Sequence, residues 1–147
     1  MANQTITQVD PDLVSGLRLI LMRLARRLRQ QAEGEVTPSM LSALSSIERQ
    51  GPLTLGDLAA VERISAPTMT TIISRLLEAG LIVKQVDAND RRFARVGLSP
   101  EGKRYVTKSR SRKDAYLAHR LAGLTPEQLK VLGQAVTILE SILEEQP

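Results

Sequence analysis

Two groups of polar and cationic side chains in the middle of this 147-residue sequence have the types and spacing needed to bind an anionic partner. The first group consists of Ser65, the expected cap of a helix, and of six residues that share one face of that helix: Pro67, Thr68, Thr71, Ser74, Arg75 and Glu78. The second group lies in a polar turn and consists of Asp90, Arg91 and Arg92. Serine and threonine hydroxyls both donate and accept hydrogen bonds, and the arginine fork binds oxyanions in a fixed geometry. The pattern therefore indicates polar recognition.

Positive charge is concentrated around these two groups. The chain has 20 Lys and Arg against 16 Asp and Glu, a formal net charge of +4. Between Glu62 and Lys113 there are 12 basic and 5 acidic residues, whereas the rest of the chain carries 8 basic and 11 acidic residues. A local excess of this kind is typical of a surface that meets a polyanion.

The sequence lacks the residues that several classes of function require. Aromatic residues make up 2% of the chain, which disfavours a stacking platform for single-stranded nucleic acid or RNA. The sequence has no cysteine, a single histidine (His119) and no glycine-rich phosphate loop. We therefore expect a non-enzymatic protein without cofactor or metal, and we interpret His119 as a structural or surface residue.

The polar N-terminal stretch lacks the basic-then-apolar layout of a secretory signal. The sequence also has no run of about 18 apolar residues that could cross a membrane. We expect a cytoplasmic protein with no membrane partner.

Capping residues followed by proline predict where most helices begin. Such pairs occur at Asp10-Pro11, Thr37-Pro38, Ser99-Pro100 and Thr125-Pro126, and Ser65 precedes Pro67 by two positions. With a short helix that starts at Thr54, these signals predict six helices, at about 10–31, 37–51, 54–61, 65–79, 99–122 and 125–143.

The hydrophobic period changes from helical to extended between the fourth and fifth helices. Residues 81–86 and 93–98 are predicted to form a β-hairpin around the polar turn 87–92. Two helices over 54–80 followed directly by a hairpin are the order of a winged helix-turn-helix. The predicted fold class is mainly α with a small β-hairpin wing.

The fourth helix has the two faces that a recognition helix requires. Its apolar side would hold the helix on a scaffold and consists of Met69, Ile72, Ile73 and Leu76. Its other side carries short polar groups, which let a backbone approach base edges in a major groove about 12 Å wide. Ser65 at the N-cap leaves first-turn N–H groups that suit a phosphate. We predict that residues 65–79 read the major groove of double-stranded DNA.

The polar turn gives a second contact, in which an arginine enters the minor groove. Asp90 should be repelled by phosphate, unless its carboxylate holds a neighbouring arginine by a charge-assisted hydrogen bond. Spacing alone leaves open the alternative that this is an ordinary solvated turn.

The stretch Leu55 to Gly102 resembles the multiple antibiotic resistance regulator (MarR) family. The resemblance rests on Ser65-Ala-Pro-Thr-Met-Thr-Thr, Arg75-Leu-Leu-Glu-Ala-Gly-Leu81 and Asp87-x-x-Asp90-Arg91-Arg92-x-x-x-Val96-x-Leu98-Ser99-x-x-Gly102. It implies that Thr68, Thr70 and Thr71 contact bases or phosphates and that Arg75 contacts a phosphate. It also implies that Asp90 organises the wing (87–95), that Arg92 enters the minor groove and that Arg91 and Arg95 lie beside it on the DNA backbone.

The resemblance further implies a homodimer. Residues 1–36 and 100–147 would form a helical dimerisation region, and residues 37–99 a DNA-binding lobe. Such a dimer would repress transcription from a pseudo-palindromic operator and be released by a small-molecule effector. The positions of the arginines of the first helix favour a solvated helix face, and the alternative is that they receive an anionic effector. No effector-binding residue is predicted. The alternative function is a winged-helix module whose basic wing docks an acidic protein.

Overall fold

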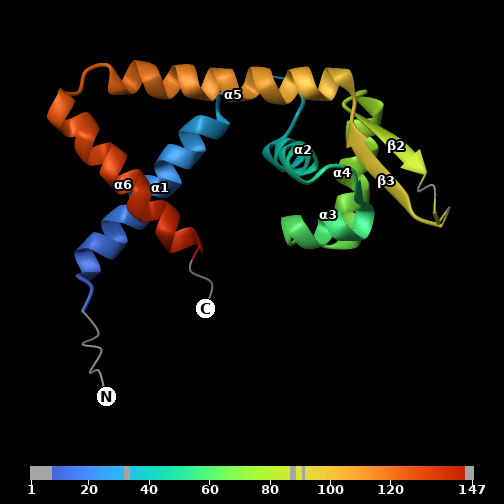
Figure 1. Cartoon of the computed structure of the whole chain (residues 1–147), viewed down its shortest axis with the longest axis horizontal. Helices are drawn as coiled ribbons and strands as arrows, with labels where there is room; N and C mark the ends of the chain where they lie inside the picture. Colours follow the sequence, from blue (N-terminus) through green and yellow to red (C-terminus); the bar gives the residue numbers. More distant parts are fainter. Residues whose placement is uncertain (1–7, 32–33, 87–88, 91, 145–147) are drawn as a thin grey trace. The chain divides into compact units, whose positions relative to one another are not determined.

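The computed structural model describes residues 8–31, 34–86, 89–90 and 92–144. Six helices and three strands form over these residues (Figure 1), in the order α1 (Pro11–Arg29), α2 (Pro38–Gln50), β1 (Leu53–Thr54), α3 (Leu55–Glu62), α4 (Ala66–Glu78), β2 (Ile82–Val86), β3 (Ala94–Leu98), α5 (Pro100–Leu121) and α6 (Pro126–Glu144). The six predicted helices and the hairpin are confirmed.

The chain divides into two compact units, residues 1–113 and 114–147. The expected division into a dimerisation region and a DNA-binding lobe concerns roles in a dimer, and it stays a prediction.

Side-chain caps begin the helices where the sequence predicts them. Asp10, Thr37 and Thr54 each accept a hydrogen bond from a backbone N–H two or three residues later, at 2.9, 3.3 and 3.1 Å. At α6 the capping is reciprocal, because the Gln128 N–H donates to Thr125 Oγ1 at 3.2 Å and the Thr125 N–H donates to Gln128 Oε1 at 3.0 Å.

The wing belongs to a three-stranded antiparallel sheet in the order β1-β3-β2. Strands β2 and β3 pair from Ile82↔Leu98 to Val86↔Ala94, and β1 adds the pair Leu53↔Val96. Figure 1 shows β2 and β3 side by side as a hairpin. The two-residue strand β1 was not predicted, because it is too short to show alternation and its Thr54 also caps α3.

An aliphatic core holds α2, α3 and α4 together in the first unit. Its fully buried members include Leu44, Leu58, Met69 and Leu76, each with 0% exposed surface. Burying a side chain of this size contributes about 1.5–3 kcal/mol. The core therefore fixes α4 by its apolar face, as the sequence predicts.

The turn between α3 and α4 contains a strained residue. Arg63 has φ 53° and ψ 43°, a left-handed conformation that costs a non-glycine residue about 1–2 kcal/mol. Its N–H and that of Ile64 donate to Ala60 O and Ala59 O at 3.2 and 3.1 Å. These bonds close the end of α3 just before Ser65, the cap of α4.

Ser99 joins the end of the sheet to the turn that follows α4. Its Oγ donates to Gly80 O at 2.6 Å and accepts from the Gly102 N–H at 3.0 Å. Because Gly80 precedes β2 and Ser99 follows β3, this one hydroxyl ties the base of the wing to the first turn of α5.

Helices α1 and α6 bury none of their residues within the chain. Large apolar side chains stay exposed on both, among them Val14, Leu17, Leu21 and Leu24 of α1 and Leu129, Leu132, Val136, Ile142 and Leu143 of α6. Among the described residues, neither these helices nor any other combines the length and apolar character that would cross a membrane.

Candidate nucleic-acid interface

The predicted recognition face is exposed along the whole of α4. Solvent reaches all seven predicted contact residues of this helix and its cap: Ser65, Pro67, Thr68, Thr70, Thr71, Ser74 and Arg75. The opposite side of α4 is buried in the core through Met69, Ile72, Ile73 and Leu76. The buried side therefore fixes α4 on the core, and the exposed side, with its short polar side chains, is free to lie in a groove.

The N-terminus of α4 offers fewer amides to an anion than the sequence suggests. Ser65 Oγ accepts from the Thr68 N–H at 3.4 Å and lies 2.9 Å from Thr68 Oγ1. Pro67 has no N–H, and the Met69 N–H donates to Ser65 O at 3.0 Å. The Ala66 N–H is the first-turn amide that this arrangement leaves for a phosphate.

Two threonine hydroxyls on the exposed face are already oriented by the helix. Thr70 Oγ1 donates to Ala66 O at 2.9 Å, and Thr71 Oγ1 donates to Pro67 O at 3.3 Å. Each hydroxyl has one proton, so in these rotamers the outward-facing oxygens are hydrogen-bond acceptors. Acceptors of this kind match the exocyclic amino groups that cytosine and adenine show in the major groove.

The wing tip contains the carboxylate–arginine pair that the sequence predicts. Arg92 Nε donates to Asp90 Oδ1 at 3.0 Å and Arg92 Nη2 donates to Asp90 Oδ2 at 2.9 Å, a bidentate pair. The Arg92 backbone N–H also donates to Asp90 Oδ1 at 3.1 Å. The Arg92 side chain remains 85% exposed. Asp90 thus orients the guanidinium without withdrawing it from a partner.

Hydrogen bonding shifts the ionisation of both members of this pair. The Arg92 side chain, and then the Arg92 backbone N–H, lower the pKa of the Asp90 carboxyl below its ordinary value. In return, the carboxylate raises the pKa of Arg92. Both groups are therefore charged at neutral pH.

The remaining predicted wing residues differ in their placement. Arg95 is half-buried within β3, where it pairs in register with Thr54 of β1 and Gln85 of β2, so it belongs to the sheet and not to the tip. Arg91 lies outside the described residues.

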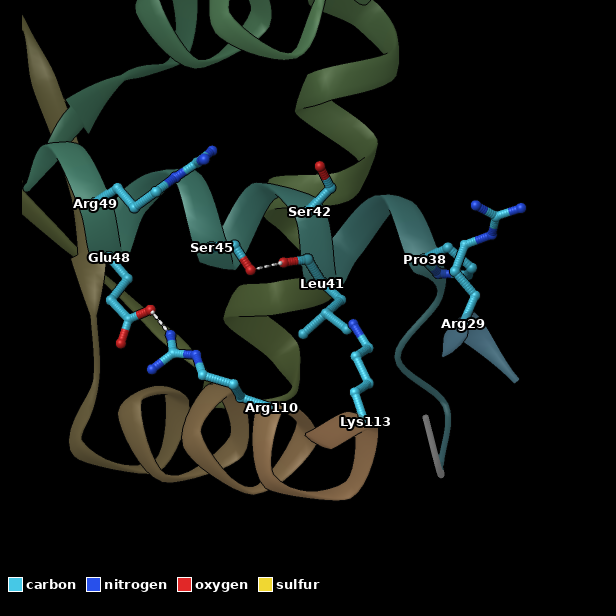
Figure 2. A pocket seen from close by; sticks show the side chains of 9 residues that line it. All are labelled: Arg29, Pro38, Leu41, Ser42, Ser45, Glu48, Arg49, Arg110 and Lys113. Atoms are coloured by element: carbon cyan, nitrogen blue, oxygen red, sulfur yellow. Dashed lines mark hydrogen bonds and ion pairs between the residues drawn. The ribbon is translucent and has the colours of Figure 1, made fainter. Parts of the chain in front are cut away.

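A pocket of about 420 Å³ lies on α2 in the first unit. It is lined by Arg29, Pro38, Leu41, Ser42, Ser45, Glu48, Arg49, Arg110 and Lys113. Figure 2 shows Glu48 and Arg110 reaching toward one another, and their ion pair measures 2.6 Å. Four cations against one paired carboxylate give the pocket a positive character. The sequence predicted none of these pocket residues individually, although the arginines of the first helix include Arg29.

The carboxylates of Glu48 and Glu62 bind different partners. Glu48 pairs with Arg110, whereas Glu62 accepts hydrogen bonds from Ser42 and Ser46 of α2. Asp57 lies in the first turn of α3, where its N–H is capped. Over the described residues, no group of three or more His, Asp or Glu could hold a metal ion.

An exposed polar helix face on an aliphatic core, followed by a hairpin with an oriented arginine at its tip, defines a winged helix-turn-helix protein. Residues 36–93 match the model of the MarR family. An uncharacterized HTH-type transcriptional regulator of Mycobacterium leprae is 33% identical over 139 residues, which cover 94% of this chain and 97% of that protein. The chain belongs to the MarR family of transcriptional regulators, as its motifs predict.

Solved structures share the fold. A putative transcriptional regulator from Pseudomonas aeruginosa PA01 superposes with a TM-score of 0.83 at 30% identity, covering 92% of this chain and 96% of that one. A mutant of MepR from S. aureus, solved bound to an oligodeoxyribonucleotide, gives a TM-score of 0.69 at 24% identity, covering 89% and 97% of the two chains. At that identity the second likeness concerns the fold alone.

Proposed function

We propose that the protein is a cytoplasmic, non-enzymatic transcriptional repressor that binds a pseudo-palindromic site in double-stranded DNA as a homodimer. The observation that carries this proposal is the exposed face of α4, since every predicted contact residue on it is accessible while the other face is buried. The S. aureus MepR mutant, which shares the fold, binds an oligodeoxyribonucleotide, and this supports DNA as the partner.

Each element has a separate part in DNA binding. Helix α4 lies in the major groove, where Thr70 and Thr71 accept hydrogen bonds from base amino groups. Arg75, exposed on the same helix, binds a phosphate. Arg92, oriented by Asp90, enters the minor groove where narrow A·T-rich stretches concentrate negative potential.

The homodimer forms through the apolar faces of α1 and α6. In α1 the residues Val14, Leu17, Leu21 and Leu24 repeat at intervals of three and four, which is the spacing of a coiled-coil seam. Each is between 37% and 52% exposed in the single chain. A second copy would cover them and would place two recognition helices on half-sites about one helical turn, ~10 bp, apart.

The positively charged pocket on α2 is the proposed effector site. Arg29, Arg49 and Lys113 supply charge without an acidic partner among the pocket residues, and Pro38 and Leu41 supply apolar surface (Figure 2). This combination fits a small organic anion with an apolar body. Binding of such a ligand would release the protein from DNA.

The first test is a gel-shift titration of the protein against a random-sequence duplex over a salt series. We expect binding that weakens steeply as salt rises, because cations released from phosphates favour the complex at low salt. Absence of any salt-sensitive binding would exclude DNA as the partner and favour the alternative in which the wing docks an acidic protein.

A further inference from the structure

Glu62, the last residue of α3, uses both oxygens of its carboxylate to hold α2. Ser42 Oγ donates to Glu62 Oε2 at 2.6 Å, and Ser46 Oγ donates to Glu62 Oε1 in a short contact. Arg49 Nη2 donates to Ser46 Oγ at 3.3 Å, so a cation polarises this hydroxyl toward the carboxylate. We call these four residues, Ser42, Ser46, Arg49 and Glu62, the Glu62 bridge.

One side of the Glu62 bridge is also a wall of the pocket. Ser42 and Arg49 both line the pocket, whereas Ser46 is fully buried behind them. In Figure 2 the side chains of Ser42 and Arg49 leave α2 on the side opposite to the Glu48–Arg110 pair. An anion that binds at Ser42 and Arg49, on that side of α2, therefore meets two members of the bridge directly.

The other side of the Glu62 bridge adjoins the strained turn before the recognition helix. Glu62 is followed by Arg63, whose left-handed backbone persists because its surroundings hold it. Two residues later Ser65 caps α4. Fixing Glu62 against α2 thus fixes the residue from which the turn and the recognition helix start.

We propose that Glu62 is the positioning residue through which the pocket controls α4. The Ser42 hydroxyl has one proton, so an anion that accepts it leaves Glu62 Oε2 without its donor. The negative charge of the anion also repels the carboxylate. The turn at Arg63 then loosens, and α4 loses its fixed position. This inference rests on the proposed function, in which α4 binds DNA and the pocket receives an anion.

A fixed negative charge can stand in for the ligand in the full-length protein. Ser42→Asp places a carboxylate at the bridge, and Ser42→Ala removes the donor without adding charge. Ser45 provides the matched control, because it lines the same pocket but donates its hydroxyl to Leu41 O at 3.0 Å within α2. Ser42 is exposed, so neither substitution disturbs the core.

The primary measurement is hydrogen exchange at the backbone amides of Arg63 and Ile64, whose hydrogen bonds close the turn. We expect exchange to rise about tenfold in Ser42→Asp and about threefold in Ser42→Ala. Exchange in Ser45→Asp and Ser45→Ala should stay at the wild-type rate. Adding Ser42→Ala to Glu62→Ala should cause no further increase, because both changes remove the same contact.

Gel shifts on the same variants form the second measurement, and DNA affinity should fall in Ser42→Asp but not in Ser45→Asp. Unchanged exchange in Ser42→Asp, or an equal rise in Ser45→Asp, would overturn the proposal, since the second result means that charge acts without the bridge. If exchange responds as expected while the wild type shows no salt-sensitive DNA binding, the Glu62 bridge stands and the proposed function fails.

Discussion

Gly102 of α5 lies directly against the backbone carbonyl of Leu81. A Cβ on Gly102 would be 1.9 Å from Leu81 O, a distance that no side chain can occupy, and 3.0 Å from Leu81 C. The same carbonyl accepts a hydrogen bond from the Ser99 N–H at 3.1 Å, so it cannot turn away without losing that bond. Because Gly102 has no side chain, the first turn of α5 packs directly against Leu81, the residue before β2.

Replacing this glycine should destabilise the first unit strongly. Overpacking against backbone costs more than alanine gains in helix propensity, and we expect Gly102→Ala to lower the free energy of unfolding by about 2–3 kcal/mol. Urea denaturation, monitored by circular dichroism, measures this free energy of unfolding. Gly56→Ala in α3 is the control, because nothing lies within 4 Å of its Cβ position, and it should leave stability unchanged or raise it. If Gly102→Ala unfolded with the same free energy as the wild type, α5 would be able to move away from Leu81 without loss of stability.

Local signals in the sequence predicted the helices and the hairpin because caps, prolines and glycines act within a few residues. Three features depend on such local signals. They are the Ser65 cap, the exposed face of α4 and Gly80, which follows the end of that helix. A pair between Asp90 and a neighbouring arginine was also predictable, because such partners lie within two residues of each other, and the structure shows that the arginine is Arg92.

Contacts between distant residues could not be predicted in this way. The close approach of Gly102 to Leu81 and the hydrogen bond from Ser42 to Glu62 join residues about twenty positions apart, and no periodicity records such contacts. The additional pairing of Arg95 with Thr54 was not predicted, because β1 is too short to leave a pattern.

The Asp90–Arg92 pair should be visible as a depressed carboxyl pKa. Hydrogen bonds from Arg92 lower the pKa of Asp90, so the pair is intact above the ordinary aspartate pKa of about 3.9 and is lost only as the pH falls through the lower folded value. Carboxyl-carbon NMR titration measures this directly. In Arg92→Ala the Asp90 pKa should rise toward the ordinary value. A titration midpoint that does not change between the two proteins would show that the pair does not persist in solution.

Arg92 should contribute most to binding where the minor groove is narrow. We expect Arg92→Ala to weaken binding about tenfold on a duplex with A·T-rich flanks and clearly less on one with G·C-rich flanks. Arg92→Lys keeps the charge but loses the bidentate pairing with Asp90. Its affinity for the A·T-rich duplex should therefore lie between those of the wild type and Arg92→Ala. Competition gel shifts with the two duplexes give the ratio. Equal affinity of Arg92→Ala and wild type on the A·T-rich duplex would refute the wing assignment.

Arg75 should behave as a phosphate contact and not as a reader of sequence. Arg75→Ala is expected to weaken binding by a similar factor on every duplex and to reduce the slope of log affinity against log salt by about one unit. Arg18→Ala in α1 removes the same charge away from the proposed interface and should leave the slope unchanged. Fluorescence anisotropy across a salt series measures both variants. An unchanged slope in Arg75→Ala would show that this side chain touches no phosphate.

The exposed seam of α1 should hold the dimer together. Leu21 is 43% exposed in the single chain, and burial of a leucine contributes about 1.5–3 kcal/mol in each of two subunits. Leu21→Glu is therefore expected to raise the dimer dissociation constant at least about a hundredfold. Leu19 is 49% exposed and lies on the opposite side of the helix, so Leu19→Glu makes the same chemical change outside the seam. Sedimentation equilibrium measures the constants. An equal loss in both variants would place the interface elsewhere on α1, and a monomeric wild type would remove the pseudo-palindromic operator from the proposal.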